Sequence, residues 1–354
     1  MTAWHLRAVQ LPDGDAPEDA WLTDAGWRDQ PGPDAEDLPG RFALTGLVDA
    51  HSHVSFGDGG GGPIPLDRAA AVAALERLAK EGVGVVRDAG GDPAVVLSLP
   101  PVPGRPFMVA AGRHLAPLGM YFEAVHLPVA GSDLVEVALR ELAAGARWVK
   151  LVADFTPARA RGEPSLDPPE QTYDLDVVGE LVIETHRSGG RVAAHVTTAL
   201  VADLVRLGID SVEHGTALDE ETLAEMARHG TAWTPTLCAV LSSPPDAPEE
   251  RRRLTAERRE RFRELLPLAV RLGVPVLTGG DAVGTIPREV ALLVDCGLDP
   301  TQALRAATVD ALAFLGTDVA DAPPSVVTYE DDPRHDPEAL ARPAAIVIGG
   351  VRVR

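Results

Sequence analysis

Short apolar strands alternate with helical segments between residues 42 and 316, and this alternation constrains the fold more than any other feature. Strand-like runs occupy 47–51, 83–87, 106–111, 148–152, 191–194, 211–213, 231–235 and 274–278. Strands that alternate with helices form parallel βα units. Eight such units in about 270 residues predict a closed (β/α)₈ TIM barrel. A doubly wound open sheet is the alternative, but no Gly-x-Gly-x-x-Gly follows the first strand.

Helices are expected wherever apolar residues recur with a period near 3.6. The first, at 66–80, has Ala71, Leu75 and Leu78 on one face, and the second has Ser132 as its predicted N-cap. The predicted segments are 66–80, 132–144, 174–188, 199–207, 219–229, 249–271, 287–296 and 300–315.

Both ends of the chain are rich in strands and lie outside the alternating pattern. The predicted end strands are 4–9, 325–329, 344–348 and a last one within 349–353. Because chain termini often lie close together, the two ends are expected to pair in one small sheet. The sequence therefore predicts two units, a barrel of residues 46–315 and a small domain of 1–45 plus 316–354.

Charge and composition restrict the class of partner. The chain has 53 acidic and 32 basic residues, a net charge of −21, which disfavours nucleic acids and anionic membrane surfaces. Its two cysteines cannot form a disulfide scaffold. No apolar run is long enough to cross a bilayer, and the N-terminus lacks a secretory signal. We expect a soluble cytoplasmic protein that acts on a small molecule; a homo-oligomer is compatible with the sequence, but no feature indicates one.

The first strand ends in a His-x-His pair, His51 and His53. Side chains alternate along a strand, so both imidazoles point to the same face and can hold one metal ion. Other metal-capable residues follow later strands, and catalytic groups of such barrels lie at the C-terminal ends of the strands. These residues are Lys150, His195, His214 and Asp281.

Each of these residues has an ordinary structural explanation. A single histidine is often a hydrogen-bonded core residue, Asp281 after two glycines suits a turn, and Lys150 can extend its amine to the rim. These explanations would all have to hold at once, at one end of one barrel. A shared site is the simpler hypothesis.

Three motifs resemble those of the metal-dependent amidohydrolase superfamily. Where its members have Pro-Gly-Leu-Ile-Asp-x-His-x-His, this chain has Thr-Gly-Leu-Val-Asp-Ala-His-Ser-His at 45–53. Val-Arg-Asp-Ala-Gly-Gly at 86–91 and Asp-Ser-Val-Glu-His-Gly-Thr at 210–216 are similar to its imidazolonepropionase-like and Xaa-Pro dipeptidase-like branch. The resemblance covers about residues 42 to 316.

The resemblance implies a β-sandwich built from both chain ends and a site with two divalent metal ions, zinc being the first expectation. His51, His53 and Asp281 would bind the more buried ion, and His195 and His214 the second. Lys150 would be N-carboxylated and bridge the two. A metal-bridged hydroxide, with Asp281 as general acid and base, would hydrolyse a C–N bond in an amide or cyclic amide, such as an N-acyl amino acid or Xaa-Pro-type dipeptide.

Alternatives remain at this stage. Lys150 could instead be a strand-end lysine beside a single metal, as in a deaminase or a lactone hydrolase. A non-catalytic relative is disfavoured because all six positions are filled. The motif at Gly279-Gly280-Asp281 departs from the family's usual Gly-Thr-Asp, so the substrate pocket differs from that of a known imidazolonepropionase.

Four residues are candidates for substrate contact. They are His114, Tyr121, Arg113 and Arg288. A surface or helix-cap salt bridge is the favoured explanation for the two arginines. Arg87 and Asp88 are interpreted as a buried structural pair at the end of the second strand.

Overall fold

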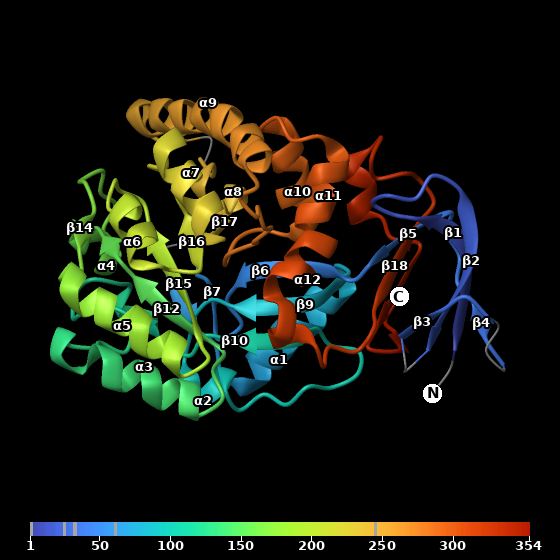
Figure 1. The fold of residues 1–354 in the computed structure, drawn as a ribbon, viewed down its shortest axis with the longest axis horizontal. Helices are drawn as coiled ribbons and strands as arrows, with labels where there is room; N and C mark the ends of the chain where they lie inside the picture. The colour runs from blue at the N-terminus through green and yellow to red at the C-terminus, as the bar shows by residue number, and fades with distance from the viewer. Residues whose placement is uncertain (1–2, 24–25, 31–33, 60–61, 244–245) are drawn as a thin grey trace.

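The parallel strands are the part of the molecule that carries the site (Figure 1). The structure, a computed structural model, describes residues 3–354 except 24–25, 31–33, 60–61 and 244–245. Near-continuous apolar runs produce parallel strands, most of which are buried along their whole length. They form two parallel sheets. The strand order of the first is β10 (Phe107–Ala110), β9 (Val83–Asp88), β6 (Leu47–Ser52). The strand order of the second is β11 (His114–Leu115), β12 (Trp148–Val152), β15 (Arg191–Val196), β16 (Ser211–His214), β17 (Ala232–Thr234).

Hydrogen bonds connect the two parallel sheets at both sides. On one side the segment 275–281 lies between β17 and β6: Trp233 N–H donates to Pro275 (2.8 Å), and Ala50 N–H donates to Thr278 (2.8 Å). On the other side Arg147 N–H, just before β12, donates to the carbonyl of Ala110 in β10 (2.9 Å). All the parallel strands therefore belong to one hydrogen-bonded arrangement.

Helices follow the strands and pack their apolar faces against them, as the periodicity predicts. In α1 the predicted stripe of Ala71, Leu75 and Leu78 is buried, and Asp67 caps the helix by accepting from Ala70 N–H (2.8 Å). The helices are α1 (Arg68–Lys80), α2 (Pro93–Val96), α3 (Leu134–Ala143), α4 (Pro157–Ala160), α5 (Leu175–Arg187), α6 (Val201–Leu207), α7 (Glu220–His229), α8 (Leu237–Val240), α9 (Glu249–Leu272), α10 (Ile286–Asp295), α11 (Pro300–Ala306) and α12 (Val309–Leu315), with 3₁₀ turns η1 (Glu123–Val125), η2 (Gly131–Asp133), η3 (Gly316–Val319) and η4 (Pro337–Ala341). None of the described helices is long and apolar enough to span a membrane.

The two ends of the chain pair with one another, as predicted. They form one mixed sheet at the right of Figure 1, where β18 pairs antiparallel with both β5 and β19. Its division into two packed layers stays a prediction. The strands of this sheet are β1 (Trp4–Gln10), β2 (Pro17–Thr23), β3 (Gly26–Arg28), β4 (Glu36–Asp37), β5 (Phe42–Thr45), β18 (Val326–Tyr329), β19 (Ala345–Ile348) and β20 (Val351–Arg352). Two short antiparallel pairs lie outside it: β7 (Phe56–Asp58) with β8 (Pro63–Pro65), and β13 (Asp154–Phe155) with β14 (Glu170–Gln171).

An apolar layer lies beneath the site. It joins side chains of several parallel strands to α12, in the way that stacked layers fill the interior of a barrel. Its members are Val48, Ala50, Val85, Val109, Ala111, Trp148, Ala193, Ala232, Leu277, Ala311 and Leu315. Two residues after Val85, Trp148, Ala193 and Ala232, toward the C-terminal strand ends, lie the polar residues Arg87, Lys150, His195 and Thr234.

Two predicted elements are less regular than expected. The segment 274–278 is not a continuous strand, because Pro275 has no N–H to donate and only Val276 bridges to Trp233. The helix predicted at 300–315 is broken into α11 and α12. The break occurs because the carbonyl of Ala307 accepts from Val48 N–H in β6 (2.8 Å) and Thr308 leaves the helical conformation (φ −141°, ψ −103°).

The prediction of an N-cap at Ser132 is wrong. Residues 131–133 form the 3₁₀ turn η2, and the helix α3 begins after it, with Asp133 at the cap position. The hydroxyl of Ser132 donates to the Asp133 side chain (3.0 Å) instead of accepting from a helix N–H.

Candidate functional site

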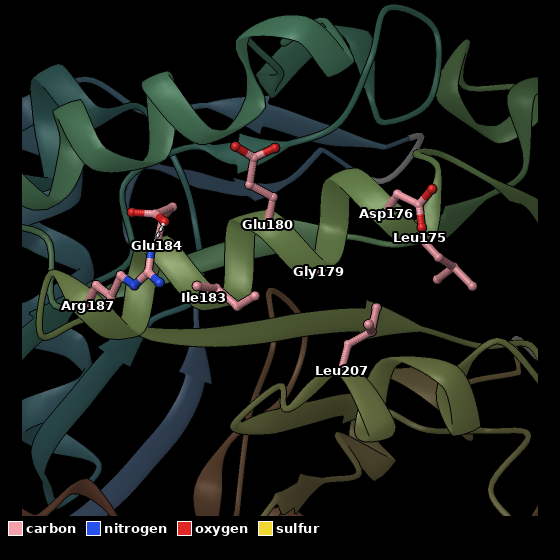
Figure 2. A pocket seen from close by; sticks show the side chains of 8 residues that line it. All are labelled: Leu175, Asp176, Gly179, Glu180, Ile183, Glu184, Arg187 and Leu207. Atoms are coloured by element: carbon pink, nitrogen blue, oxygen red, sulfur yellow. Dashed lines mark hydrogen bonds and ion pairs between the residues drawn. The ribbon is translucent and has the colours of Figure 1, made fainter.

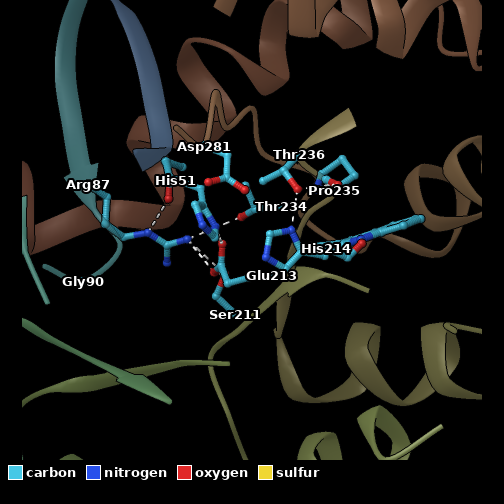
Figure 3. Close-up of polar contacts among 12 residues, drawn as sticks. His51, Arg87, Gly90, Ser211, Glu213, His214, Thr234, Pro235, Thr236 and Asp281 are labelled. Carbon is cyan, nitrogen blue, oxygen red and sulfur yellow. Dashed lines mark hydrogen bonds and ion pairs between the residues drawn. The ribbon is translucent and has the colours of Figure 1, made fainter. Parts of the chain in front are cut away.

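Three side chains from separate strand ends meet at the centre of the site (Figure 3). They are His51 at the end of β6, His214 at the end of β16 and Asp281 after the segment 275–281. Each offers one ligand atom, and these atoms lie within 4.8 Å of one another. Imidazole nitrogens and a carboxylate oxygen are suitable ligands for a divalent transition-metal ion.

The other predicted residues lie around this group. His53 Nε2 is 3.4 Å from Asp281 Oδ1, and the His195 ring lies 4.4 Å from that of His214, centroid to centroid. Lys150 is 1% exposed, and its Nζ has no hydrogen-bond partner among the described residues. Its charge acts on both His51 and His214. The fold therefore brings all six predicted residues together.

Three of the histidines are oriented by a hydrogen bond at Nδ1. His51 faces the carboxylate of Glu213, and His53 faces the carbonyl of Gly90 (2.8 Å). His214 faces the hydroxyl of Thr236 (2.6 Å), which in turn donates to Pro235. Because these partners accept, Nδ1 carries the proton and Nε2 keeps a free lone pair. This is the arrangement in which histidines bind a metal.

Burial acts on the titrating groups of the site, and His51 and His214 both have a lowered pKa. Burial and the charge of Lys150 lower the pKa of His51 to about 4. Burial and His51 lower the pKa of His214 to about 3. Burial raises the pKa of Asp281, but the contact with His53 and the charges of nearby histidines outweigh it, so the pKa lies well below the ordinary value. Burial also lowers the pKa of Lys150, to about 8.

Backbone strain is concentrated at the site. In the described part of the chain, four residues other than glycine have a positive φ, and three of them are His214 (68°), Thr236 (48°) and Asp281 (55°). Such conformations cost free energy and persist where the surrounding structure imposes them. At Asp281 a backbone hydrogen bond holds the strained residue in place, because its N–H donates to the carbonyl of His51 (2.7 Å).

Glu213 was not among the predicted residues, and Arg87 pairs with it and not, as predicted, with Asp88. Both side chains are fully buried. Arg87 does not pair with its neighbour Asp88: its Nη2 lies 2.6 Å from Glu213, and its guanidinium stacks on Trp148 at 4.4 Å. Asp88 instead accepts from Val54 N–H (2.8 Å). A charged residue inside the buried run Ser-Val-Glu-His was the available signal for Glu213.

Asp49 is a second buried residue of the site that was not predicted. Its carboxylate is 2% exposed and accepts from the N–H groups of His51 (3.2 Å) and Gly280 (3.0 Å). Burial raises its pKa to about 7. Asp49 therefore joins the backbone at His51 to the backbone at Gly280, the residue before Asp281.

Of the predicted substrate contacts, His114 and Tyr121 lie beside the site and the two arginines do not contact it. The His114 ring is 5.4 Å from that of His53 and 4.4 Å from that of Tyr121. Neither ring nitrogen of the buried His114 has a hydrogen-bond partner among the described residues. Arg113 pairs with Glu141, and Arg288 is exposed in the first turn of α10, which agrees with the structural explanation.

A hollow of about 470 Å³ lies elsewhere, between α5 and α6 (Figure 2). Leu207 of α6 faces side chains of α5, including Ile183. None of the predicted site residues lines it. This hollow is therefore separate from the histidine cluster.

Comparison with known proteins gives the family. The sequence profile of the amidohydrolase family matches residues 42–320. An uncharacterized protein of Mycobacterium tuberculosis (strain ATCC 25618 / H37Rv) is 33% identical over 98% of this chain and 94% of its own length. The chain belongs to the amidohydrolase family. It is a hydrolase, and its family generally uses metal ions.

Solved structures agree on the fold of this amidohydrolase. A prolidase complexed with N-methylphosphonate-L-proline has a TM-score of 0.78 at 23% identity, with all of both chains covered. A Xaa-Pro dipeptidase with bound methionine has a TM-score of 0.78 at 20% identity, with 99% of each chain covered. The Aspergillus niger ochratoxinase has a TM-score of 0.77 at 20% identity, covering 100% of this chain and 96% of its own. These likenesses show a TIM-barrel-like α/β fold.

Proposed function

We propose that this amidohydrolase hydrolyses a C–N bond of a small amide or cyclic amide, such as an N-acyl amino acid or a Xaa-Pro-type dipeptide. The observation that carries the proposal is the convergence of ligand atoms from His51, His214 and Asp281 within 4.8 Å. Structural neighbours described as a prolidase and a Xaa-Pro dipeptidase support this choice of substrate.

Two divalent ions, zinc first, fit the donor set. His51, His53 and Asp281 would hold one ion, and His195 and His214 the other. Lys150 would bridge them after N-carboxylation, because a buried amine without a partner gains an anionic oxygen donor when it becomes a carbamate. Bound in this way, divalent ions activate water and polarise a carbonyl.

Asp281 is the general acid and base of the proposal. Its carboxylate is ionised and lies among the imidazoles, so it takes a proton from the attacking water as the new C–O bond forms. It then delivers that proton to the leaving nitrogen as the C–N bond breaks. His114 and Tyr121 would contact the substrate beside His53, where the ring nitrogens of His114, which have no hydrogen-bond partner in the described part of the chain, could bind it.

The proposal includes the architecture around the site. The parallel strands would form a closed (β/α)₈ barrel of residues 46–315, supported by the bonds that segment 275–281 and Arg147 make across the gaps between sheets. Residues 1–45 and 316–354 would form a small β-sandwich beside it, supported by the pairing of β5 with β18.

One observation favours a second candidate. The ligand atoms of His51, His214 and Asp281, which lie within 4.8 Å of one another, are enough for one ion. A mononuclear deaminase or lactone hydrolase would use such a site. A Lys150→Ala variant separates the two. In a two-metal enzyme it should lose one ion and most of the activity, whereas in the alternative it should keep the single ion and the activity.

A metal-replete activity screen tests the proposal. The substrates are N-acyl amino acids, Xaa-Pro dipeptides and lactones, and His195→Ala is the control. We expect turnover of at least one amide class, and a fall in kcat/KM of at least about tenfold in His195→Ala. Turnover of lactones alone, or equal activity in the variant, would contradict the proposal.

A further inference from the structure

A fully buried carboxylate, Asp154, holds the chain just after His195. Asp154 begins the short strand β13, two residues after the end of β12. Its oxygens accept from the backbone N–H groups of Thr197 (2.9 Å) and Thr198 (2.9 Å), and from the hydroxyl groups of the same two threonines (2.9 and 2.8 Å). A carboxylate has about four lone-pair sites, so these donors occupy it. The side chain of Asp154 is therefore a clamp on residues 197–198.

The residues on either side of Asp154 contact the same strand end. Ala153 N–H donates to the carbonyl of His195 (2.9 Å). The ring of Phe155 lies 5.8 Å from the ring of His195, centroid to centroid. Three consecutive residues thus contact the carbonyl of His195, the chain that follows it and its imidazole.

The clamped segment is also joined to the loop that follows His214. The carbonyl of Thr197 accepts from the hydroxyl of Thr216 (3.0 Å), and Gly215 N–H donates to the carbonyl of Val196 (3.1 Å). The ends of β15 and β16 are therefore connected directly after their histidines. These are the two histidines assigned to the second ion.

His195 differs from the other histidines of the site in how its ring is held. His51, His53 and His214 each face a hydrogen-bond partner at Nδ1. In the part of the chain that the structure describes, the His195 ring has no hydrogen-bond partner, and it packs against the rings of Phe155 and His214. Metal-binding histidines are normally oriented by such a bond, so the position of His195 depends on its backbone and on packing.

We propose that Asp154 is a positioning residue for His195 and sets the affinity of the site for its second ion. The inference rests on the proposed function, in which His195 and His214 hold that ion. Asp154 acts through the backbone of 195–198, so the ion held by His51 and His53 should not depend on it. Groups that orient a metal ligand change metal affinity about 10–100-fold, and here the change should be confined to one ion.

Zinc titration of the metal-free full chain tests the inference. Zinc is added in bicarbonate buffer against a competing chromophoric chelator, so that each binding step gives its own dissociation constant. Asp154→Asn places an NH₂ group against the donors of the clamp, and Thr198→Val, a milder change, removes one hydroxyl donor. His195→Ala identifies the step that belongs to the second ion. Asp210→Asn is the matched control, because Asp210 accepts from Val192 N–H (2.7 Å) near the start of β15, at the opposite end of the strand from His195.

We expect Asp154→Asn to weaken the second step about tenfold and Thr198→Val to weaken it about threefold, with the first step within about twofold of the wild type. Asp210→Asn should change neither step. The role of Asp154 is contradicted if both steps weaken equally, if neither changes, or if the control weakens the second step as much. Failure of the proposed function looks different: a wild type with one binding step that His195→Ala leaves intact rejects the two-ion site, and the role of Asp154 with it.

Discussion

The buried carboxylate of Glu213 accepts a hydrogen bond from Nδ1–H of His51, a residue 162 positions away in the sequence. Its second oxygen faces Arg87 Nη2 at 2.6 Å, so one carboxylate fixes the imidazole of β6 and neutralises a buried cation (Figure 3). Burial raises the pKa of Glu213, but Arg87 and His51 outweigh it and hold the pKa well below the ordinary value. The orientation of a candidate metal ligand thus depends on a residue outside the candidate ligand set.

Glu213→Gln should destabilise the protein and weaken the site together. The change leaves the Arg87 guanidinium buried without a counter-charge, which should lower the free energy of unfolding by about 3 kcal/mol. Loss of a carboxylate behind a histidine ligand should also weaken metal binding by about tenfold or more. Urea unfolding and metal titration measure the two effects.

Glu257→Gln is the matched control, since Glu257 pairs with Arg253 on the surface of α9. An exposed pair contributes less than about 1 kcal/mol, so this variant should unfold like the wild type. Equal losses in the two variants would show that Glu213 has no special role.

Gly279→Ala should displace His51. A Cβ at position 279 would lie 2.6 Å from Cβ of His51 and 2.8 Å from Cγ2 of Thr234, so the strand end has to shift. We expect a loss of about 2 kcal/mol in the free energy of unfolding and weaker metal binding. Gly131→Ala is the control, because its nearest contact would be an ordinary 3.7 Å to Tyr173; unchanged metal binding in Gly279→Ala would refute the close approach.

Glu289 should make stability depend on pH. Its carboxylate accepts from Leu237 N–H (2.6 Å) and Cys238 N–H (2.8 Å), next to the Thr236 that orients His214, and burial raises its pKa to about 7. A raised pKa means that the folded state holds the proton more tightly, so the contribution is present below about pH 4.5 and is lost as the pH rises through about 7.

The wild type should therefore lose on the order of 3 kcal/mol relative to Glu289→Gln between pH 5 and pH 8. The two proteins share every other titrating group, so the difference between their urea-unfolding curves isolates Glu289. Differences that stay constant over this range would mean that the carboxyl titrates normally.

Gly179→Ala should stabilise the protein. Gly179 lies inside α5, where alanine is favoured over glycine by about 0.5–1 kcal/mol. The added Cβ would lie 3.3 Å from the end of the Leu207 side chain (Figure 2), which can move by a few tenths of an ångström. Thermal unfolding should show a higher Tm, and a lower one would mean that Leu207 cannot move.

The strand ends were predictable because local patterns determine them. An apolar run followed by histidine places that histidine at the rim of a parallel sheet, and this holds for His51, His195 and His214. The partners of these residues were not predictable, since Arg87 and Glu213 are 126 positions apart and only the assembled fold brings them together.

The irregular elements escaped prediction for a related reason. Propensity favours one helix over 300–315, but the Ala307 carbonyl bonds to β6, a contact that the local sequence does not contain.

Metal content measures the central claim most directly. The protein would be purified without chelator from cells supplied with zinc, and its metal counted per chain by elemental analysis, beside His51→Ala and Lys150→Ala. We predict about two ions per chain in the wild type and a loss in both variants, with Lys150→Ala retaining one at most. Fewer than one ion per wild-type chain would contradict the account.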